Sequence, residues 1–150
     1  MSSEALIEKY FRPGRLPHIW CPGCGNGIVT GCMVRAIDQL GLNKDDVAVV
    51  SGIGCSSRAS GYLDFNTVHS AHGRALPVAT GVKLGNPKLN VLVVTGDGDC
   101  TAIGGNHLIH AVRRNQDLNI TIFNNEIYGL TKGQYSPTTK FGQVTKTSPF

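Results

Sequence analysis

An α/β fold with a parallel sheet flanked by helices is the class that this sequence predicts, on two observations. Three short runs, at 47–50, 91–94 and 120–123, are wholly or largely apolar, and segments with helical patterns separate them. Strands that are apolar on both faces are buried on both sides, as in the centre of a parallel sheet. The intervening helices supply the crossover connections that parallel strands need.

Composition limits the classes of protein that this chain can be. Its 150 residues suit one domain with one core, and 41% of them are hydrophobic, which excludes a disordered or fibrous chain. Charged residues make up only 16%, against about 25% in an ordinary domain, and the 19 glycines indicate many tight loops. The chain is therefore expected to bury part of its surface against partner chains.

Charge and hydropathy argue against two kinds of partner. The 14 basic residues exceed the 10 acidic ones by 4, and the longest basic run is Arg113-Arg114, so no nucleic-acid surface is predicted. No apolar stretch reaches the roughly 18 residues of a membrane span. The N-terminus lacks the pattern of a signal peptide, which predicts a cytoplasmic protein. In that reducing compartment the five cysteines are expected to be metal ligands or thiols rather than disulfides.

The N-terminal part is predicted to contain an arm, one helix and one strand. Residues 1–20 include two prolines and a glycine and are expected to form an extended arm. An amphipathic helix follows Gly25 and ends at Gly41, before the strand at 47–50. The apolar stripe expected to face the core is Val29, Met33, Ala36, Ile37 and Leu40.

The remaining chain repeats this alternation. A second helix is predicted over 75–84, because a proline is tolerated in its first turn. The strand at 91–94, a helix over 106–114 and the strand at 120–123 follow. No internal repeat or linker interrupts this series, so residues 1–150 are treated as one domain.

Polar and glycine-rich segments follow directly after each predicted strand. These segments are 52–55, 96–99 and 124–125. In a parallel sheet they lie at the same edge, where such folds bind ligands. Asp97, Asn125 and the carbonyl of Ile127 supply the oxygen ligands that Mg²⁺ prefers, and the glycines let a diphosphate approach the main chain. Each segment alone would be an ordinary loop, but their combination at this spacing favours a metal and diphosphate site.

Several short motifs occur in an order that resembles a known family. They are Trp20-Cys21-Pro22-Gly23-Cys24-Gly25, Ile53-Gly54-Cys55-Ser56, His72-Gly73-Arg74-Ala75, Gly96-Asp97-Gly98 with Asn124-Asn125, and Tyr128-Gly129-Leu130-Thr131. From about residue 10 to the C-terminus the chain resembles the beta subunit of a 2-oxoacid:ferredoxin oxidoreductase. The resemblance implies a thiamine diphosphate-binding fold in which Asp97, Asn125 and Ile127 hold Mg²⁺. The cofactor contacts that it implies are Ile53, Gly54, Cys55, Ser56, His72, Asp97, Gly98, Asp99, Asn125, Ile127, Leu130 and Thr131.

Cys21, Cys24 and Cys55 are the candidates for a metal or cluster site. Spacing alone favours zinc, and free thiols are an alternative, above all for Cys32 and Cys100. The resemblance assigns the first three to a [4Fe-4S] cluster, which usually takes four cysteines. In the family the fourth cysteine comes from a later segment, so the chain is expected to be a truncated piece or one part of a split subunit.

Two cationic side chains are candidates for the substrate site. Arg58 follows Cys55 by three residues and could pair with the substrate carboxylate, although a structural arginine is an equal alternative. Lys132 follows the last motif and is expected at the pocket mouth, or else on the surface. The sequence Gly54-Cys55-Ser56-Ser57-Arg58 resembles the corresponding segment of the 2-oxoglutarate-type members of this family.

The activity that the resemblance implies is oxidative decarboxylation of a 2-oxoacid with coenzyme A, giving an acyl-CoA, CO₂ and reduced ferredoxin. Thiamine chemistry needs a carboxylate, but the only glutamates are Glu4, Glu8 and Glu126. In the family this glutamate comes from the alpha subunit, so that partner is expected, with ferredoxin as electron acceptor. The alternatives are a non-oxidative thiamine diphosphate decarboxylase and a zinc-stabilised α/β binding module.

Overall fold

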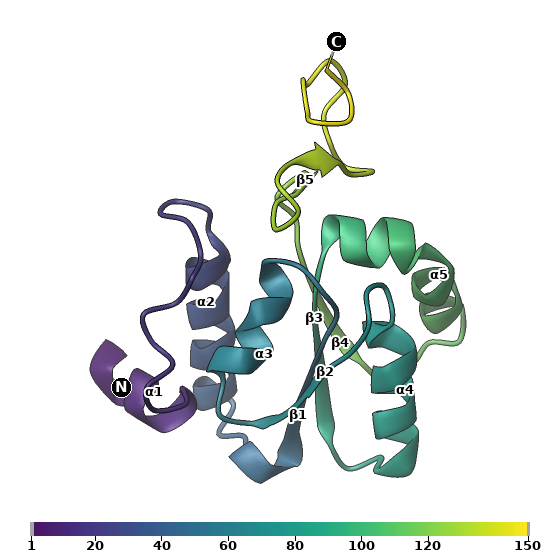
Figure 1. The fold of residues 1–150 in the computed structure, drawn as a ribbon. Coiled ribbons are helices and arrows are strands. Elements are labelled where there is room, and N and C mark those ends of the chain that lie inside the picture. Colours follow the sequence, from purple (N-terminus) through teal and green to yellow (C-terminus); the bar gives the residue numbers. More distant parts are fainter. Residues whose placement is uncertain (1, 150) are drawn as a thin grey trace.

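A parallel four-stranded sheet lies at the centre of the computed structural model, which describes residues 2–149 (Figure 1). Its strands are β1 (Val47–Ser51), β2 (Asn66–His69), β3 (Asn90–Gly96) and β4 (Asn119–Phe123). They lie in the order β2-β1-β3-β4, and all three pairings are parallel. The predicted α/β class and its three central runs are confirmed.

Helices cover both faces of this sheet (Figure 1). The helices are α1 (Ser3–Tyr10), α2 (Asn26–Gln39), α3 (Ala59–Tyr62), α4 (Ala75–Gly85) and α5 (Gly105–Arg113). Shorter turns are η1 (Lys44–Asp46), η2 (Ser56–Arg58) and the wide turn η3 (Gly98–Ile103), and a small hairpin pairs β5 (Ile127–Tyr128) with β6 (Gln134–Tyr135). Within residues 2–149, none of these helices has the length and apolar character needed to span a membrane.

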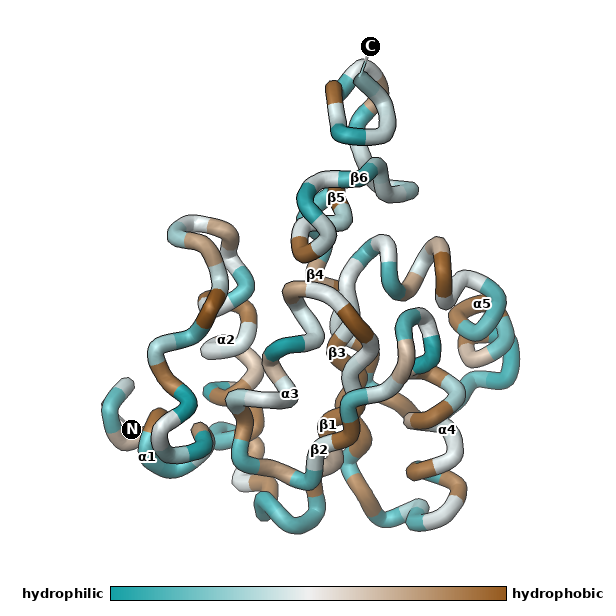
Figure 2. Tube along the Cα trace, viewed as in Figure 1, coloured by the Kyte–Doolittle hydropathy of each residue, from teal (hydrophilic) through white to brown (hydrophobic). Residues whose placement is uncertain are grey.

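Alternate residues of the central strands face two separate cores. Val47 and Val49 of β1 pack with α1, α2 and α3, whereas Ala48 and Val50 pack with α4 on the opposite face. Because side chains alternate across a strand, a strand between two helix layers must be apolar at every position. Figure 2 shows this as an apolar centre along the strands with hydrophilic residues in the outer turns.

The expected extended arm over 1–20 is wrong for residues 3–10, which form α1. The Ser2 hydroxyl caps this helix by accepting a hydrogen bond from the Ala5 N–H over 3.3 Å. Tyr10 is fully buried at the end of α1, and its hydroxyl donates to Asp38 of α2 over 2.9 Å. The two prolines that suggested an arm lie after the helix and do not interrupt it.

The buried face of α2 also differs from the predicted stripe. Val29, Ala36 and Leu40 are exposed. Predicted Ile37 and Met33 do pack in or against the core, and the other buried residues are Asn26, Thr30 and Val34. Thr30 can occupy this face because its hydroxyl donates to the main-chain carbonyl of Asn26 over 2.8 Å, which gives the buried hydroxyl a partner.

The end of α2 was predicted correctly from the sequence, whereas the edge strand β2 was not predicted. Gly41 ends α2 as predicted, with a φ of +64° and an N–H that donates to Asp38 over 3.0 Å. Strand β2 was not predicted, because Asn66–His69 lies at the sheet edge and is mostly exposed and polar. Edge strands need little apolar character, so their sequences resemble loops.

Candidate cofactor site

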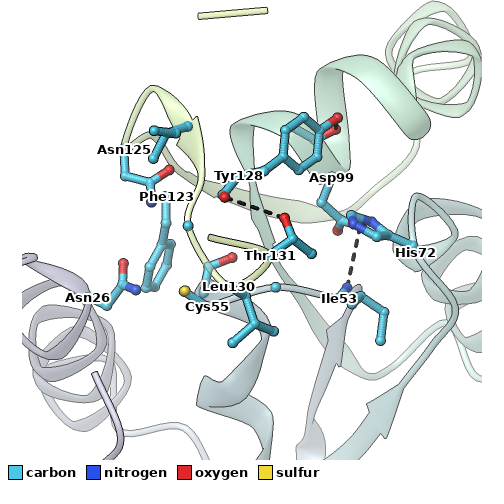
Figure 3. A pocket seen from close by; sticks show the side chains of 15 residues that line it. Asn26, Ile53, Cys55, His72, Asp99, Phe123, Asn125, Tyr128, Leu130 and Thr131 are labelled. Atoms are coloured by element: carbon cyan, nitrogen blue, oxygen red, sulfur yellow. Dashed lines mark hydrogen bonds and ion pairs between the residues drawn. The ribbon is translucent and has the colours of Figure 1, made fainter. Parts of the chain in front are cut away.

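A pocket opens at the carboxyl ends of β1, β3 and β4, where the sequence predicted a ligand site (Figure 3). After β1 the chain passes to α3 on one face of the sheet, whereas after β3 it passes to α5 on the other. The two connections therefore diverge and leave a crevice, which is where α/β sheets bind ligands. The pocket encloses about 450 Å³, including open solvent at its mouth.

Most of the expected cofactor-contacting residues line this pocket. They are Ile53, Gly54, Cys55, Ser56, His72, Gly98, Asp99, Asn125, Ile127, Leu130 and Thr131. Asp97 is the exception, because it lies beneath the lining with 1% of its surface exposed. The lining also includes Asn26, Phe123, Tyr128 and Gly129, which the sequence did not single out as contacts. Tyr128 and Gly129 belong to a motif that was noted, whereas nothing in the sequence marked Asn26 or Phe123.

Three oxygen atoms from two neighbouring strand ends converge beside the pocket. The Asn125 side-chain oxygen lies 2.8 Å from the Ile127 carbonyl oxygen and 2.9 Å from an Asp97 carboxylate oxygen, and turning the amide over would convert both contacts into hydrogen bonds. Oxygens at right angles around Mg²⁺, with bonds of about 2.05 Å, are about 2.9 Å apart. Whichever way the Asn125 amide is turned, its end lies next to both the Asp97 carboxylate and the Ile127 carbonyl, at the spacing of neighbouring ligands around one ion, so the residues fit the predicted magnesium ion.

Two hydroxyl groups from the C-terminal segment hold the other Asp97 oxygen. Ser136 donates to Asp97 Oδ2 over 2.5 Å, and the Thr138 hydroxyl lies 2.7 Å from the same atom. These bonds leave Asp97 Oδ1 directed at Asn125. Sequence reasoning missed both residues, since they follow Asp97 by 39 and 41 positions and carry no motif.

Asp99 joins three segments of the pocket wall. Its Oδ1 accepts hydrogen bonds from the Gly73 N–H over 2.7 Å, from the Ile53 N–H over 3.4 Å and from His72 Nδ1. Its Oδ2 accepts the Thr95 hydroxyl proton over 2.6 Å. Because the carboxylate is engaged and 3% exposed, Asp99 acts on the pocket by positioning His72 and the loop after β1.

Tyr128 closes one side of the pocket over the loop after β3 (Figure 3). Its hydroxyl donates to the Gly98 carbonyl over 2.9 Å. Burial raises the pKa of Tyr128, and the carboxylates of Asp97 and Asp99 raise it further, so this hydroxyl stays a donor. A methyl group at Gly98 would lie 2.4 Å from the Tyr128 ring, and glycine is therefore required for this close packing.

Residues 52–150 match a family model described as "Thiamine pyrophosphate enzyme, C-terminal TPP binding domain". The chain belongs to the thiamine pyrophosphate enzymes.

Proteins similar to this thiamine pyrophosphate enzyme domain carry related names. "2-oxoglutarate synthase subunit KorB" of Archaeoglobus fulgidus is 58% identical over 98% of this chain and 55% of its own length. "2-oxoglutarate oxidoreductase subunit KorB" of Mycobacterium tuberculosis is 55% identical over 87% of this chain and 35% of its own. "2-oxoacid:ferredoxin oxidoreductase subunit beta" of Saccharolobus solfataricus is 51% identical over 87% of this chain and 43% of its own.

A solved structure confirms the fold. "2-oxoglutarate:ferredoxin oxidoreductase from Magnetococcus marinus with 2-oxoglutarate, coenzyme A and succinyl-CoA bound" superposes with a TM-score of 0.92 at 42% identity. The match covers 96% of this chain and 49% of that one. The predicted resemblance to a beta subunit is therefore confirmed for this domain, which spans about half the length of the relatives it matches.

The candidate cluster cysteines of this thiamine pyrophosphate enzyme domain lie near the same pocket. The Trp20 indole N–H donates to the Cys55 carbonyl over 2.6 Å, which brings the Cys21–Cys24 loop against the Cys55 loop. Burial raises the pKa of Cys55, and Cys21 and Cys24 raise it further by their charge. Among residues 2–149, however, no three His, Cys, Asp or Glu side chains are close enough to hold one metal ion.

The two cationic candidates lie outside the cofactor pocket. Arg58 does not line it and instead lines a neighbouring cleft with Arg12 and Arg15. Lys132 is exposed beside Thr131, at a φ of +79°, and its side chain is not part of the pocket wall either. The structure thus gives Arg58 a setting different from the expected one, and the mouth position of Lys132 stays a prediction.

Proposed function

We propose that this domain binds thiamine diphosphate through Mg²⁺ in the pocket between β1, β3 and β4, as part of a 2-oxoacid:ferredoxin oxidoreductase in the cytoplasm. The observation that carries the proposal is the convergence of the Asp97, Asn125 and Ile127 oxygens beside this pocket. The names of the similar proteins support 2-oxoglutarate as the 2-oxoacid, with coenzyme A and ferredoxin as further reactants. The products would be an acyl-CoA, CO₂ and two reduced ferredoxins.

The residues of the chain would bind and orient the cofactor, which supplies an electron sink for decarboxylation when bound. Asp97, Asn125 and Ile127 would hold Mg²⁺ against the diphosphate, and Gly98 lies in the pocket wall beside them. Asp99 fixes the His72 ring, whose second nitrogen is then available to the pocket. Glu126 does not line the pocket, and its carboxylate lies 3.5 Å from Lys140, so the partner alpha subunit would supply the glutamate.

Isothermal titration of thiamine diphosphate, with and without Mg²⁺, tests the binding site. We expect Mg²⁺-dependent binding that Asp97→Ala abolishes and that Asn125→Ala weakens at least about tenfold, as for the loss of a group that holds a metal. Asn125→Ala keeps the bonds from Ser136 and Thr138 to Asp97, so it separates loss of the ligand from loss of the fold. Asp117→Asn removes an exposed carboxylate elsewhere and is the matched control. Binding that is independent of Mg²⁺ and equal in all variants would contradict the proposal.

We further propose that Cys21, Cys24 and Cys55 ligate a [4Fe-4S] cluster with a fourth ligand from outside residues 2–149. The hydrogen bond from the Trp20 indole to the Cys55 carbonyl supports this assignment, because it holds the Cys21–Cys24 loop against the Cys55 loop. Iron and sulfide analysis of the anaerobically purified holoenzyme distinguishes a cluster from zinc. A brown preparation containing iron is expected, and a colourless one with stoichiometric zinc would favour the binding module.

A further inference from the structure

Three arginines line a second cleft, which shares no lining residue with the cofactor pocket. The cleft lies between the segment 12–19 and the η2–α3 turn, and it encloses about 740 Å³ including open solvent. Its lining residues are Arg12, Gly14, Arg15, Pro17, Ile19, Arg58, Gly61 and Tyr62. None of these is acidic, so the cleft concentrates three positive charges.

These charges have no carboxylate partner. The ion pairs found within residues 2–149 involve lysines and one histidine, and none includes Arg12, Arg15 or Arg58. Arg12 donates to a neutral group, the Thr67 hydroxyl, over 2.6 Å. The Nε atom of Arg58 is buried and has no hydrogen-bond partner. The Arg58 guanidinium therefore carries its charge into the cleft without an acceptor among residues 2–149, and an anion there would supply one to its terminal nitrogens.

The backbone around the cleft is held in place before any ligand arrives. The Arg12 N–H donates to the Tyr62 carbonyl over 2.8 Å, and the Ile19 N–H donates to the Tyr62 hydroxyl over 2.9 Å. Both ends of the segment 12–19 are therefore fixed to the same residue of α3. A site whose backbone is already ordered loses less conformational entropy on binding than a mobile loop does.

We propose that Arg12, Arg15 and Arg58 bind a phosphate group of a small ligand in this cleft. Guanidinium groups match the oxygens of phosphate through paired hydrogen bonds, and a phosphate carries more charge than one carboxylate to balance three arginines. The open mouth of the cleft leaves room for the remainder of a larger molecule. This site is separate from the thiamine diphosphate pocket and does not depend on that assignment.

Titration with inorganic phosphate, followed through the arginine Nε–H signals in NMR spectra of the ¹⁵N-labelled chain, tests the proposal. Mg²⁺ and excess thiamine diphosphate are present throughout, so that phosphate cannot report on the cofactor pocket. We expect saturable shifts of the Arg58 signal and an affinity that falls about tenfold in Arg15→Gln, the loss expected for one charged hydrogen-bonding partner. Arg15 is exposed, so this variant should fold.

Arg114→Gln provides the matched control, because it removes the same charge from the exposed end of α5. The proposal requires that this variant bind phosphate like the unmodified chain. An equal loss in Arg114→Gln would reveal a general charge effect and overturn it, as would the absence of saturable shifts at Arg58. Tighter binding of 2-oxoglutarate, which has two carboxylates and no phosphate, at the same arginines would also overturn it.

Discussion

Asp97 and Asp99 stand two residues apart, and their different partners give them different roles. Asp97 keeps one oxygen for the cation position because Ser136 and Thr138 engage the other. Both carboxylate oxygens of Asp99 already accept hydrogen bonds, Oδ1 from the Gly73 N–H and Oδ2 from the Thr95 hydroxyl. The sequence predicted Asp97 as a Mg²⁺ ligand and Asp99 as a cofactor contact, and the structure adds that Asp99 holds His72 and the loop after β1 in place.

Asp99→Asn should destabilise the domain and weaken thiamine diphosphate binding together. An amide cannot accept from all of the donors around Asp99, so at least one buried donor would lose its partner, at a cost of about 2 kcal/mol. Urea unfolding should show this loss as a lower midpoint with an unchanged slope. Unchanged stability and unchanged cofactor affinity would show that Asp99 does not position the pocket.

The cysteines should differ in their reaction with iodoacetamide as a function of pH. Burial raises the pKa of Cys100 to about 11, and the neighbouring Asp99 contributes to the rise. Between pH 9 and about 11 the Cys100 thiol is protonated in the native state but ionised in the unfolded chain. The free energy of unfolding should therefore fall as the pH rises through this range. At pH 8.5 mass spectrometry should find exposed Cys32 modified and Cys100 intact. Equal modification of both in the folded protein would contradict the structure.

At the scale of elements, the buried strands were predictable and the edges were not. Helices cover both faces of β1 and β3, so the central residues of these strands are apolar on both sides. This continuous apolar run is what made the two strands predictable. β2 has no such apolar pattern. The two prolines that follow α1 led to the prediction of an extended arm in place of this helix. The stripe of α2 was misplaced because two polar residues lie on its buried face: Thr30 bonds to a main-chain carbonyl, and Asn26 lines the cofactor pocket.

The candidate site was predictable to a similar degree. Residues that follow a buried strand, such as Asn125 and Gly98, could be placed at one sheet edge by topology. Ser136 and Thr138 could not, because their contact with Asp97 depends on how the C-terminal segment folds back. The setting of Arg58 likewise depends on which side of η2 its side chain leaves.

The wide turn η3 should tolerate no side chain at its first residue. Gly98→Ala places a methyl group 2.4 Å from the Tyr128 ring, so the ring must move and its hydrogen bond to the Gly98 carbonyl is lost. We expect a loss of stability of about 1–3 kcal/mol, as for other overpacked sites. Gly81→Ala is the control, because its methyl group meets open space in α4 and should stabilise the helix by up to about 1 kcal/mol. Similar unfolding midpoints for the two variants would refute this packing.

At the scale of the whole molecule, the domain supplies a binding site without a complete catalytic apparatus. The glutamates are at positions 4, 8 and 126, and none of them lines the cofactor pocket. We expect the chain to bind Mg²⁺ and thiamine diphosphate but to reduce ferredoxin only when the alpha subunit is added. An assay of 2-oxoglutarate-dependent ferredoxin reduction checks this expectation, and turnover by the chain alone would disprove it.

The C-terminal segment leaves the body of the molecule just after β4 and extends away from the sheet (Figure 1). Its base holds Asn125 and Ile127, while Phe141 and Val144 farther along are exposed. The Mg²⁺ ion of the proposed function would therefore join this projecting segment to Asp97 at the end of β3. Without the ion, the hydroxyl contacts to Asp97 and the packing of Tyr128 on Gly98 would hold the segment, so cofactor occupancy would strengthen the docking of the projection.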